Sequence, residues 1–218
     1  FKPMDIPLEK KIKKWFTSSY EIDENGVYNT EGNVIIMNYH EERLPIKFGK
    51  VGNFSCFRTE LTTLEGCPEE VILNFSCSES KITSLKGAPK KVNGNFNCSN
   101  NKLTSLEGAP EKINGDFVCS DNELKSLKGC TKEVGGKFNC SSNKLTDLKG
   151  SPKKVGDDFY CIDNKLTTLE GCPKEIDGNF SCAENELKSL KGCPQEISYN
   201  FVCRGNPGNF TKEDVKKV

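Results

Sequence analysis

A phenylalanine recurs every 21 residues through most of the chain. The column contains Phe54, Phe75, Phe96, Phe117, Phe138, Phe159, Phe180 and Phe201. Each is followed two residues later by Cys, and the first seven are then followed by Leu or Ile, Leu, Gly and, in most repeats, Pro. A fixed period of this length predicts a solenoid, in which each repeat contacts mainly its neighbours and the stacked repeats share one continuous core.

Within one repeat, the order of residues predicts a short strand, a polar turn and a return limb without helix. In Phe96-x-Cys98 the apolar residues have the period of a strand with one buried face, so the alternate side chains should face solvent. Asn101 belongs to a column of asparagines that can satisfy backbone groups of its own turn and the next. Gly108 marks a corner with positive φ, and Pro110 forbids a regular helix, so the return limb should be extended or form a single tight turn.

The run from Phe96 through Cys98 and Asn101 to Leu103 resembles the strand and asparagine segment of the leucine-rich repeat, with Phe and Cys in place of two leucines. The return limb resembles the helix-poor repeats of bacterial leucine-rich effectors. The whole phrase, for example residues 82–103, is similar to 21-residue repeats of proteins from large tailed bacteriophages and some bacteria. The resemblance covers residues 33 to 210.

What the resemblance implies is an α/β solenoid, a right-handed leucine-rich repeat with a concave parallel β-sheet and a helix-poor convex side. It also implies a phage protein that binds and inhibits a host protein, such as a component of antiviral defence. These are expectations for the structure to test.

The repeat divides the chain into three parts. Residues 1–32 are expected to form an N-terminal cap, with a helix over residues 5–17 capped by Asp5 and a hairpin around Asn25-Gly26. Residues 33–205 form the solenoid: one degenerate repeat that is one residue short, seven full repeats and a final strand. Residues 206–218 form a C-terminal cap, because Thr211 to Asp214 has the form of a capping box that starts a helix over 212–218. Val215 and Val218, with Phe210, would cover the last turn.

Composition and charge limit the function classes. Thirty-one basic and 31 acidic residues give a formal net charge of zero, which provides no attraction toward nucleic acid or anionic membranes. No apolar run approaches the length of a membrane span, and residues 1–20 lack the apolar core of a signal peptide. We therefore expect a cytoplasmic protein, which for a viral protein means the host cytoplasm.

The twelve cysteines indicate packing rather than chemistry. Eight occupy the inward strand position, and the other four share a column with Ala88, Ala109 and Ser151, so small volume is the common requirement. We expect free thiols. No C-x-x-C pair occurs and His40 is the one histidine, so neither a metal site nor a nucleophile with its base is indicated. The chain is not expected to be an enzyme or to bind a cofactor.

The exposed face of the predicted sheet carries mainly Asn, Ser and Asp, and the departures from that background are the candidate binding residues. They are Phe57, Arg58, Val118, Tyr160, Ile162, Val202 and Arg204. Aromatic, aliphatic and Arg side chains commonly anchor protein interfaces, and the last four could form one patch. Scattered surface hydrophobes are the alternative interpretation.

The sequence therefore predicts noncatalytic binding of a protein through the concave face. Two alternatives remain open. One is a structural or self-assembling repeat protein, and the other is a targeting module of a larger effector enzyme.

Overall fold

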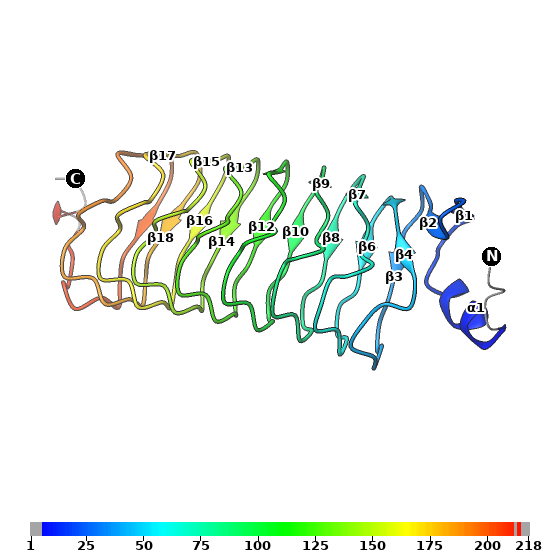
Figure 1. Cartoon of the computed structure of the whole chain (residues 1–218). Coiled ribbons are helices and arrows are strands. Elements are labelled where there is room, and N and C mark those ends of the chain that lie inside the picture. Colours follow the sequence, from blue (N-terminus) through cyan, green and yellow to red (C-terminus); the bar gives the residue numbers. More distant parts are fainter. Residues whose placement is uncertain (1–5, 212, 215–218) are drawn as a thin grey trace.

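The structure, a computed structural model, describes residues 6–211, 213 and 214. These residues form an elongated stack of about eight turns that runs from the N-terminal helix to the C-terminal end (Figure 1). The turns of the repeat contribute short strands to two parallel arrays along the body, so the fold is a β-solenoid. The predicted repeat architecture is confirmed, whereas the predicted α/β class is wrong.

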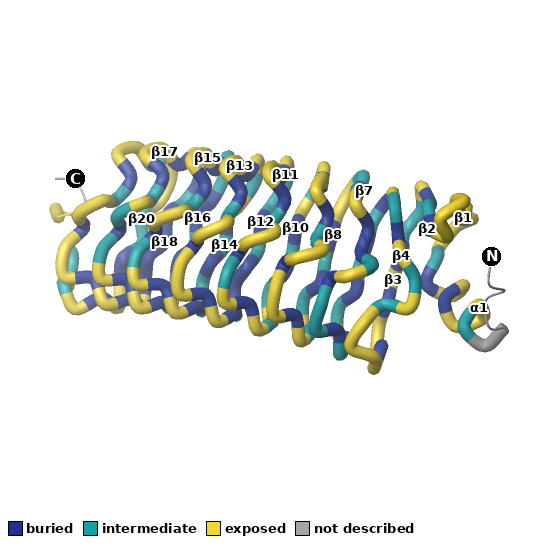
Figure 2. The backbone as a smooth tube through the Cα atoms, viewed as in Figure 1, coloured by how far each residue is buried: buried dark blue, intermediate teal, exposed yellow. Residues whose placement is uncertain are grey.

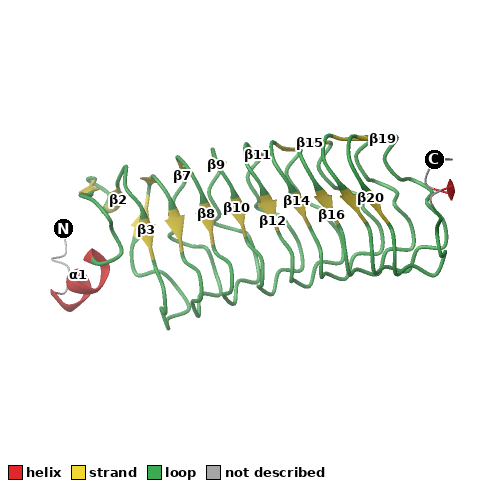
Figure 3. Ribbon diagram, turned by 180° about the vertical axis from the view of Figure 1, so that it is seen from behind, coloured by secondary structure: helices red, strands yellow, loops and turns green. Residues whose placement is uncertain are grey.

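The larger sheet has nine parallel strands, one from the start of each turn, which lie side by side in Figure 3. In order they are β3 (Val34–Ile35), β6 (Phe54–Ser55), β8 (Phe75–Ser76), β10 (Phe96–Asn97), β12 (Phe117–Val118), β14 (Phe138–Asn139), β16 (Phe159–Tyr160), β18 (Phe180–Ser181) and β20 (Phe201–Val202). Each core Phe pairs with the Phe of the next turn, for example Phe96 with Phe117. Val34 pairs with Phe54 at a separation of 20 residues, so the degenerate first repeat is one residue short, as predicted.

The return limb forms the second array, which explains why the α/β prediction fails. Its strands are β5 (Lys50–Val51), β7 (Glu70–Val71), β9 (Lys91–Val92), β11 (Lys112–Ile113), β13 (Glu133–Val134) and β15 (Lys154–Val155), followed by the separate pair β17 (Glu175–Ile176) and β19 (Glu196–Ile197). The limb turns a corner at glycines such as Gly108, which has φ +97°. A Cβ there would lie 2.7 Å from the carbonyl oxygen of Leu85, so glycine is required. After the corner, the prolines keep the backbone extended.

The N-terminal residues cover the first edge of the nine-stranded sheet. Helix α1 (Ile6–Lys13) is shorter than the predicted helix over residues 5–17, and Asp5 lies outside the described residues. The chain after α1 instead runs antiparallel to β3: Phe16 bridges Val34, and the N–H of Ile35 donates to the carbonyl oxygen of Trp15 at 2.8 Å. The free edge of β3 is therefore satisfied by the protein's own backbone.

The predicted hairpin forms and joins the stack. Strands β1 (Glu21–Ile22) and β2 (Val27–Asn29) pair antiparallel around Gly26, whose φ is +77°. Strand β2 also pairs in parallel with β4 (Lys47–Phe48), so the hairpin continues the return limb by one more strand. The predicted cap is thus an extension of the solenoid.

The C-terminal end differs from the expectation of a helical cap. Strand β20 ends the nine-stranded sheet, with no further strand beside it among the described residues. The capping interaction is present, because the N–H of Thr211 donates to Oδ2 of Asp214 at 2.8 Å. Only Glu213 and Asp214 have helical backbone, however, and Lys212 and residues 215–218 lie outside the described residues. No helical cap is therefore supported.

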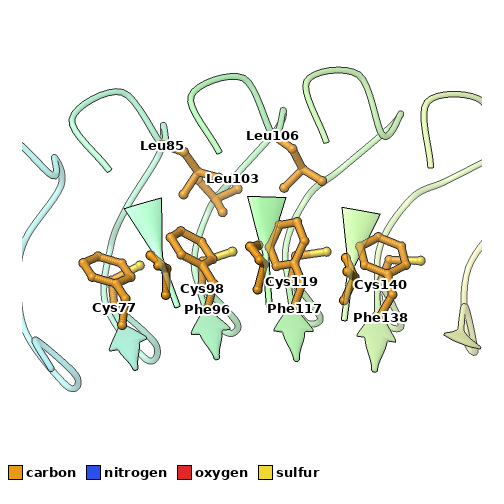
Figure 4. Packing of buried hydrophobic residues seen from close by; sticks show 14 of the residues in the cluster. Cys77, Leu85, Phe96, Cys98, Leu103, Leu106, Phe117, Cys119, Phe138 and Cys140 are labelled. Carbon is orange, nitrogen blue, oxygen red and sulfur yellow. The ribbon is translucent and has the colours of Figure 1, made fainter. Parts of the chain in front are cut away.

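One continuous core fills the solenoid. The Phe and Cys side chains of successive strands point into the same interior, where leucines such as Leu103 and Leu106 meet them (Figure 4). Ring centroids of neighbouring core phenylalanines from Phe54 to Phe201 lie 5.0–5.7 Å apart. The buried segments recur at equivalent places in each turn (Figure 2). Burial of each apolar side chain stabilises the fold by about 1.5–3 kcal/mol.

The asparagine column is a structural ladder. Nδ2 of Asn143 donates to the carbonyl oxygens of Cys119 and Cys140, each at 3.1 Å, and its Oδ1 accepts the N–H of Leu124 at 3.0 Å. The amide therefore links its own turn to the preceding turn, rather than to the next turn as predicted. Thr59 and Ser80 replace it at the start of the stack, where their hydroxyls bond each other and the carbonyl oxygen of Cys56.

A second column has left-handed backbone that the sequence analysis did not predict. The residue four positions after each core Phe has φ between +52° and +55° in seven turns, and Gly205 has φ +69° in the eighth. The seven are Arg58, Glu79, Asn100, Asp121, Ser142, Asp163 and Glu184. This conformation turns the chain sharply out of each strand and places these side chains along one rim of the sheet.

Candidate protein-binding face

The solvent side of the nine-stranded sheet is lined by the first and third residues after each core Phe, and we call it the sheet face. Its middle is polar and internally bonded. Oδ1 of Asn97 accepts the N–H of Ser99 at 3.0 Å and its hydroxyl at 2.8 Å, and Asn139 accepts the N–H of Ser141 at 3.0 Å. Because the Oδ1 atoms of these amides are already bonded within their own turn, they are not free to accept hydrogen bonds from a ligand.

The structure brings four of the predicted residues together at one end of the sheet face, and we call this group the C-terminal patch: Tyr160, Ile162, Val202 and Arg204. Tyr160 pairs with Ser181 and Ser181 with Val202, so the four side chains flank β18 on both sides. Ser181 and Ala183 lie between them and are only 4% and 3% exposed, although both belong to the solvent side of the sheet. The larger neighbours therefore leave little room for water above β18, and the patch is contiguous.

A hydrogen-bonded cluster fixes the Tyr160 side chain. Its hydroxyl donates to Oδ2 of Asp158 at 2.6 Å, while Oδ1 of Asp158 accepts the backbone N–H of Asn179 at 2.8 Å and its Nδ2 at 2.7 Å. Nζ of Lys137 lies 3.5 Å from Oδ2 of the same carboxylate. Because its hydroxyl is held, the ring is ordered before any partner binds.

The cluster shifts both titrating groups. Burial by itself raises the pKa of Asp158, but hydrogen bonds from Tyr160 and Asn179, with the charge of Lys137, lower it to about 2. The hydrogen bond to Asp158, with burial, raises the pKa of Tyr160 to about 12. Asp158 is therefore a carboxylate and Tyr160 a neutral phenol at neutral pH.

The remaining predicted residues lie apart from this patch. Val118 shares the column of Tyr160 but is separated from it by Asn139 on β14. Phe57 and Arg58 follow β6, which lies five strand spacings from β16, or about 24 Å at ~4.8 Å per spacing. Arg58 is committed to its own chain, because its Nε lies 2.8 Å from Glu79.

Two exposed apolar residues near Phe57 were missed by the sequence analysis. Ile35 is 40% and Met37 47% exposed, and both occupy sheet-face positions of the degenerate first repeat. Ile35 pairs with Ser55, which places Met37 beside Phe57. With Phe57 they form an N-terminal patch. The alignment of Val34-x-Ile36 with Phe-x-Cys was the signal that could have identified them.

The thiols show no arrangement for chemistry. All twelve cysteines are unpaired, and burial raises the pKa of the Cys98 and Cys140 thiols, so these two remain protonated and weakly nucleophilic. In the part of the chain that the structure describes, no cluster of three His, Cys, Asp or Glu side chains could hold a metal ion. None of the described helices has the length and apolar character needed to cross a bilayer.

Comparison of the chain with protein-family models, with curated proteins and with solved structures gives no match.

Proposed function

We propose that the chain is a noncatalytic protein-binding scaffold that uses the C-terminal patch of its sheet face. The observation that carries this proposal is the near-complete burial of Ser181 and Ala183 between Tyr160, Ile162 and Val202. Interface anchors are typically aromatic or Arg side chains in a desolvated setting. Tyr160 meets this description because its ring is ordered by Asp158, so binding costs little side-chain entropy.

The resemblance of the repeat to leucine-rich repeats supports a protein as the partner. The asparagine ladder and the inward leucines support that resemblance at the level of single residues. The further similarity to repeats of tailed bacteriophages favours a host protein as the partner, which the chain would inhibit by occupying its surface. The host cytoplasm is the corresponding compartment.

Affinity capture with matched variants tests the proposal. Immobilised wild-type chain is exposed to bacterial lysate beside Ile162→Ser/Val202→Ser, which removes two anchors, and Lys153→Glu/Lys154→Glu, which reverses two exposed charges on the return limb. A partner of the patch is retained by wild type and by the return-limb variant and is lost by the patch variant. Capture of the same proteins by all three chains would contradict the proposal.

One observation favours end-to-end self-association as a second candidate function. Phe201 is half-buried at the last strand, whereas the other seven phenylalanines of the 21-residue column are at most 1% exposed, and Tyr199 beside it is 73% exposed. Because the edge of β3 is covered, two chains would meet through their β20 ends. A mass in solution that rises with concentration, and that falls to the monomer on Tyr199→Ser, would support this function. The other alternative, that the chain is a targeting module of a larger effector enzyme, stays an untested expectation.

A further inference from the structure

We infer that the segment of the partner bound at the C-terminal patch is basic, with one or two apolar side chains flanked by Lys or Arg. This inference rests on the proposed function and adds the chemistry of the ligand. It follows from the charges that surround the patch on both sides.

On the rim that follows the strands, three exposed carboxylates have no ion partner among the described residues. They are Asp163 and Glu184 in the left-handed column and Glu186 two positions further along. On the opposite side, half-exposed Asp157 precedes β16 together with Asp158, which is ionised but buried and paired with Lys137. The patch therefore lies between two acidic margins.

The cations near the patch do not balance these margins. Lys137 is held by Asp158, and Lys165, Lys188 and Arg204 are the other cations of these turns. Five carboxylates thus stand against four cations around β16 to β20. The equivalent rim positions at the other end of the sheet are neutralised, since Glu79 pairs with Arg58 and Glu60 with Lys81. Asp121, in the middle of the left-handed column, is also exposed and has no ion partner among the described residues, so the unpaired rim carboxylates extend from the middle of the sheet to the end that carries the C-terminal patch.

The size of the patch suits a short segment. Strands β16 and β20 lie about 9.6 Å apart at ~4.8 Å per spacing, and the two sheet-face residues of one strand lie about 7 Å apart. That area accommodates one or two apolar side chains, with basic groups reaching the two margins. The same carboxylates repel nucleic acid phosphates and anionic lipid headgroups, so a protein segment is the ligand that fits both charge and shape.

Two fluorescent peptides that share the same Leu and Phe residues provide the test. One carries Lys at every other position and the second carries Glu there, and binding to the full chain is measured by anisotropy. We expect the Lys peptide to bind about tenfold or more tightly than the Glu peptide, and to weaken as NaCl rises from about 50 to about 500 mM. Asp163→Asn/Glu184→Gln should weaken Lys-peptide binding about threefold or more. Glu111→Gln/Glu175→Gln on the return limb should leave it unchanged.

The variants separate failure of this inference from failure of the proposed function. Equal or tighter binding of the Glu peptide that is lost in Ile162→Ser/Val202→Ser would overturn the basic-partner inference and leave the patch as the site. Lys-peptide binding that persists in the patch variant would overturn both. Absence of binding by either peptide at the solubility limit of the chain would also overturn the inference, because a patch this accessible should hold a complementary segment.

Discussion

The hydroxyl of Tyr160 donates a 2.6 Å hydrogen bond to the carboxylate of Asp158, two residues earlier on the same side of the sheet. This bond links the candidate site to the fold. It orders an aromatic ring that would contact a partner, and it satisfies a carboxylate that is only 5% exposed. Tyr160 therefore contributes to stability as well as to the proposed interface.

Removal of that hydroxyl should destabilise the protein in a pH-dependent way. Tyr160→Phe keeps the ring but should lower the free energy of unfolding by about 1.5 kcal/mol at pH 7, since bonds to charged groups are the stronger ones. Asp158 has a lowered pKa in the folded state, so the stability it contributes is present above its unfolded pKa near 3.8 and is lost as pH falls toward about 2. Urea unfolding at pH 7 and pH 3 should show a smaller effect of the substitution at pH 3. An effect that stays constant with pH would contradict the assigned bond.

The asparagine ladder should be more important to stability than polar residues of the sheet face. Asn143→Ala leaves the N–H of Leu124 without its acceptor and removes one of the two asparagine donors from each of the carbonyl oxygens of Cys119 and Cys140, which should cost about 1–3 kcal/mol. Asn139→Ala is the matched control, because Asn139 is half-exposed and water can replace its bond to Ser141. Equal shifts of the urea midpoint in the two variants would refute the ladder.

The left-handed column predicts a stabilising substitution. Ser142 has φ +52° and makes no side-chain hydrogen bond within the described residues, so Ser142→Gly should raise the free energy of unfolding by about 0.5–1 kcal/mol. Ser141→Gly is the control at the neighbouring position, which lacks positive φ. This substitution should lower the free energy of unfolding. Thermal unfolding of both variants distinguishes them, and a lower Tm for Ser142→Gly would show that the column is not strained.

The core phenylalanines should contribute different amounts to the free energy of unfolding, depending on their place in the stack. Phe138 is fully buried between two ring neighbours, so Phe138→Ala should cost about 3–5 kcal/mol. Phe201 is half-buried with one ring neighbour, Phe180, so Phe201→Ala should cost less than half as much. Equal losses in chemical denaturation would indicate that something covers the last turn in solution.

Sequence alone predicted the stacking because the period of Phe and Cys fixes the strand register, and the asparagine column fixes where each strand ends. The return limb was only partly predicted. Proline excluded helix correctly, but the second parallel array arises from backbone pairing between turns, and pairs such as Lys112 with Glu133 carry no apolar alternation that would predict a strand.

Local chemistry explains the other differences. Arg and Glu residues rarely adopt positive φ, so the presence of Arg58, Glu79 and Glu184 did not indicate a left-handed column. Asn100 and Gly205 in the same column were consistent with one. The N-terminal patch was missed because the first repeat lacks the Phe and Cys that mark the others. The bond from Tyr160 to Asp158 follows the two-residue period of a strand, and that period could have predicted it.

Site-specific photocrosslinking tests the central claim, that a protein partner contacts the C-terminal patch, most directly. A photoreactive phenylalanine is placed at Ile162 in one copy of the chain and at Lys154, on the return limb, in a second copy. After irradiation in bacterial lysate, the account predicts a discrete covalent adduct with a host protein from position 162 and none from position 154. An adduct from position 154 without one from position 162 would contradict it and place the interface on the opposite side of the solenoid.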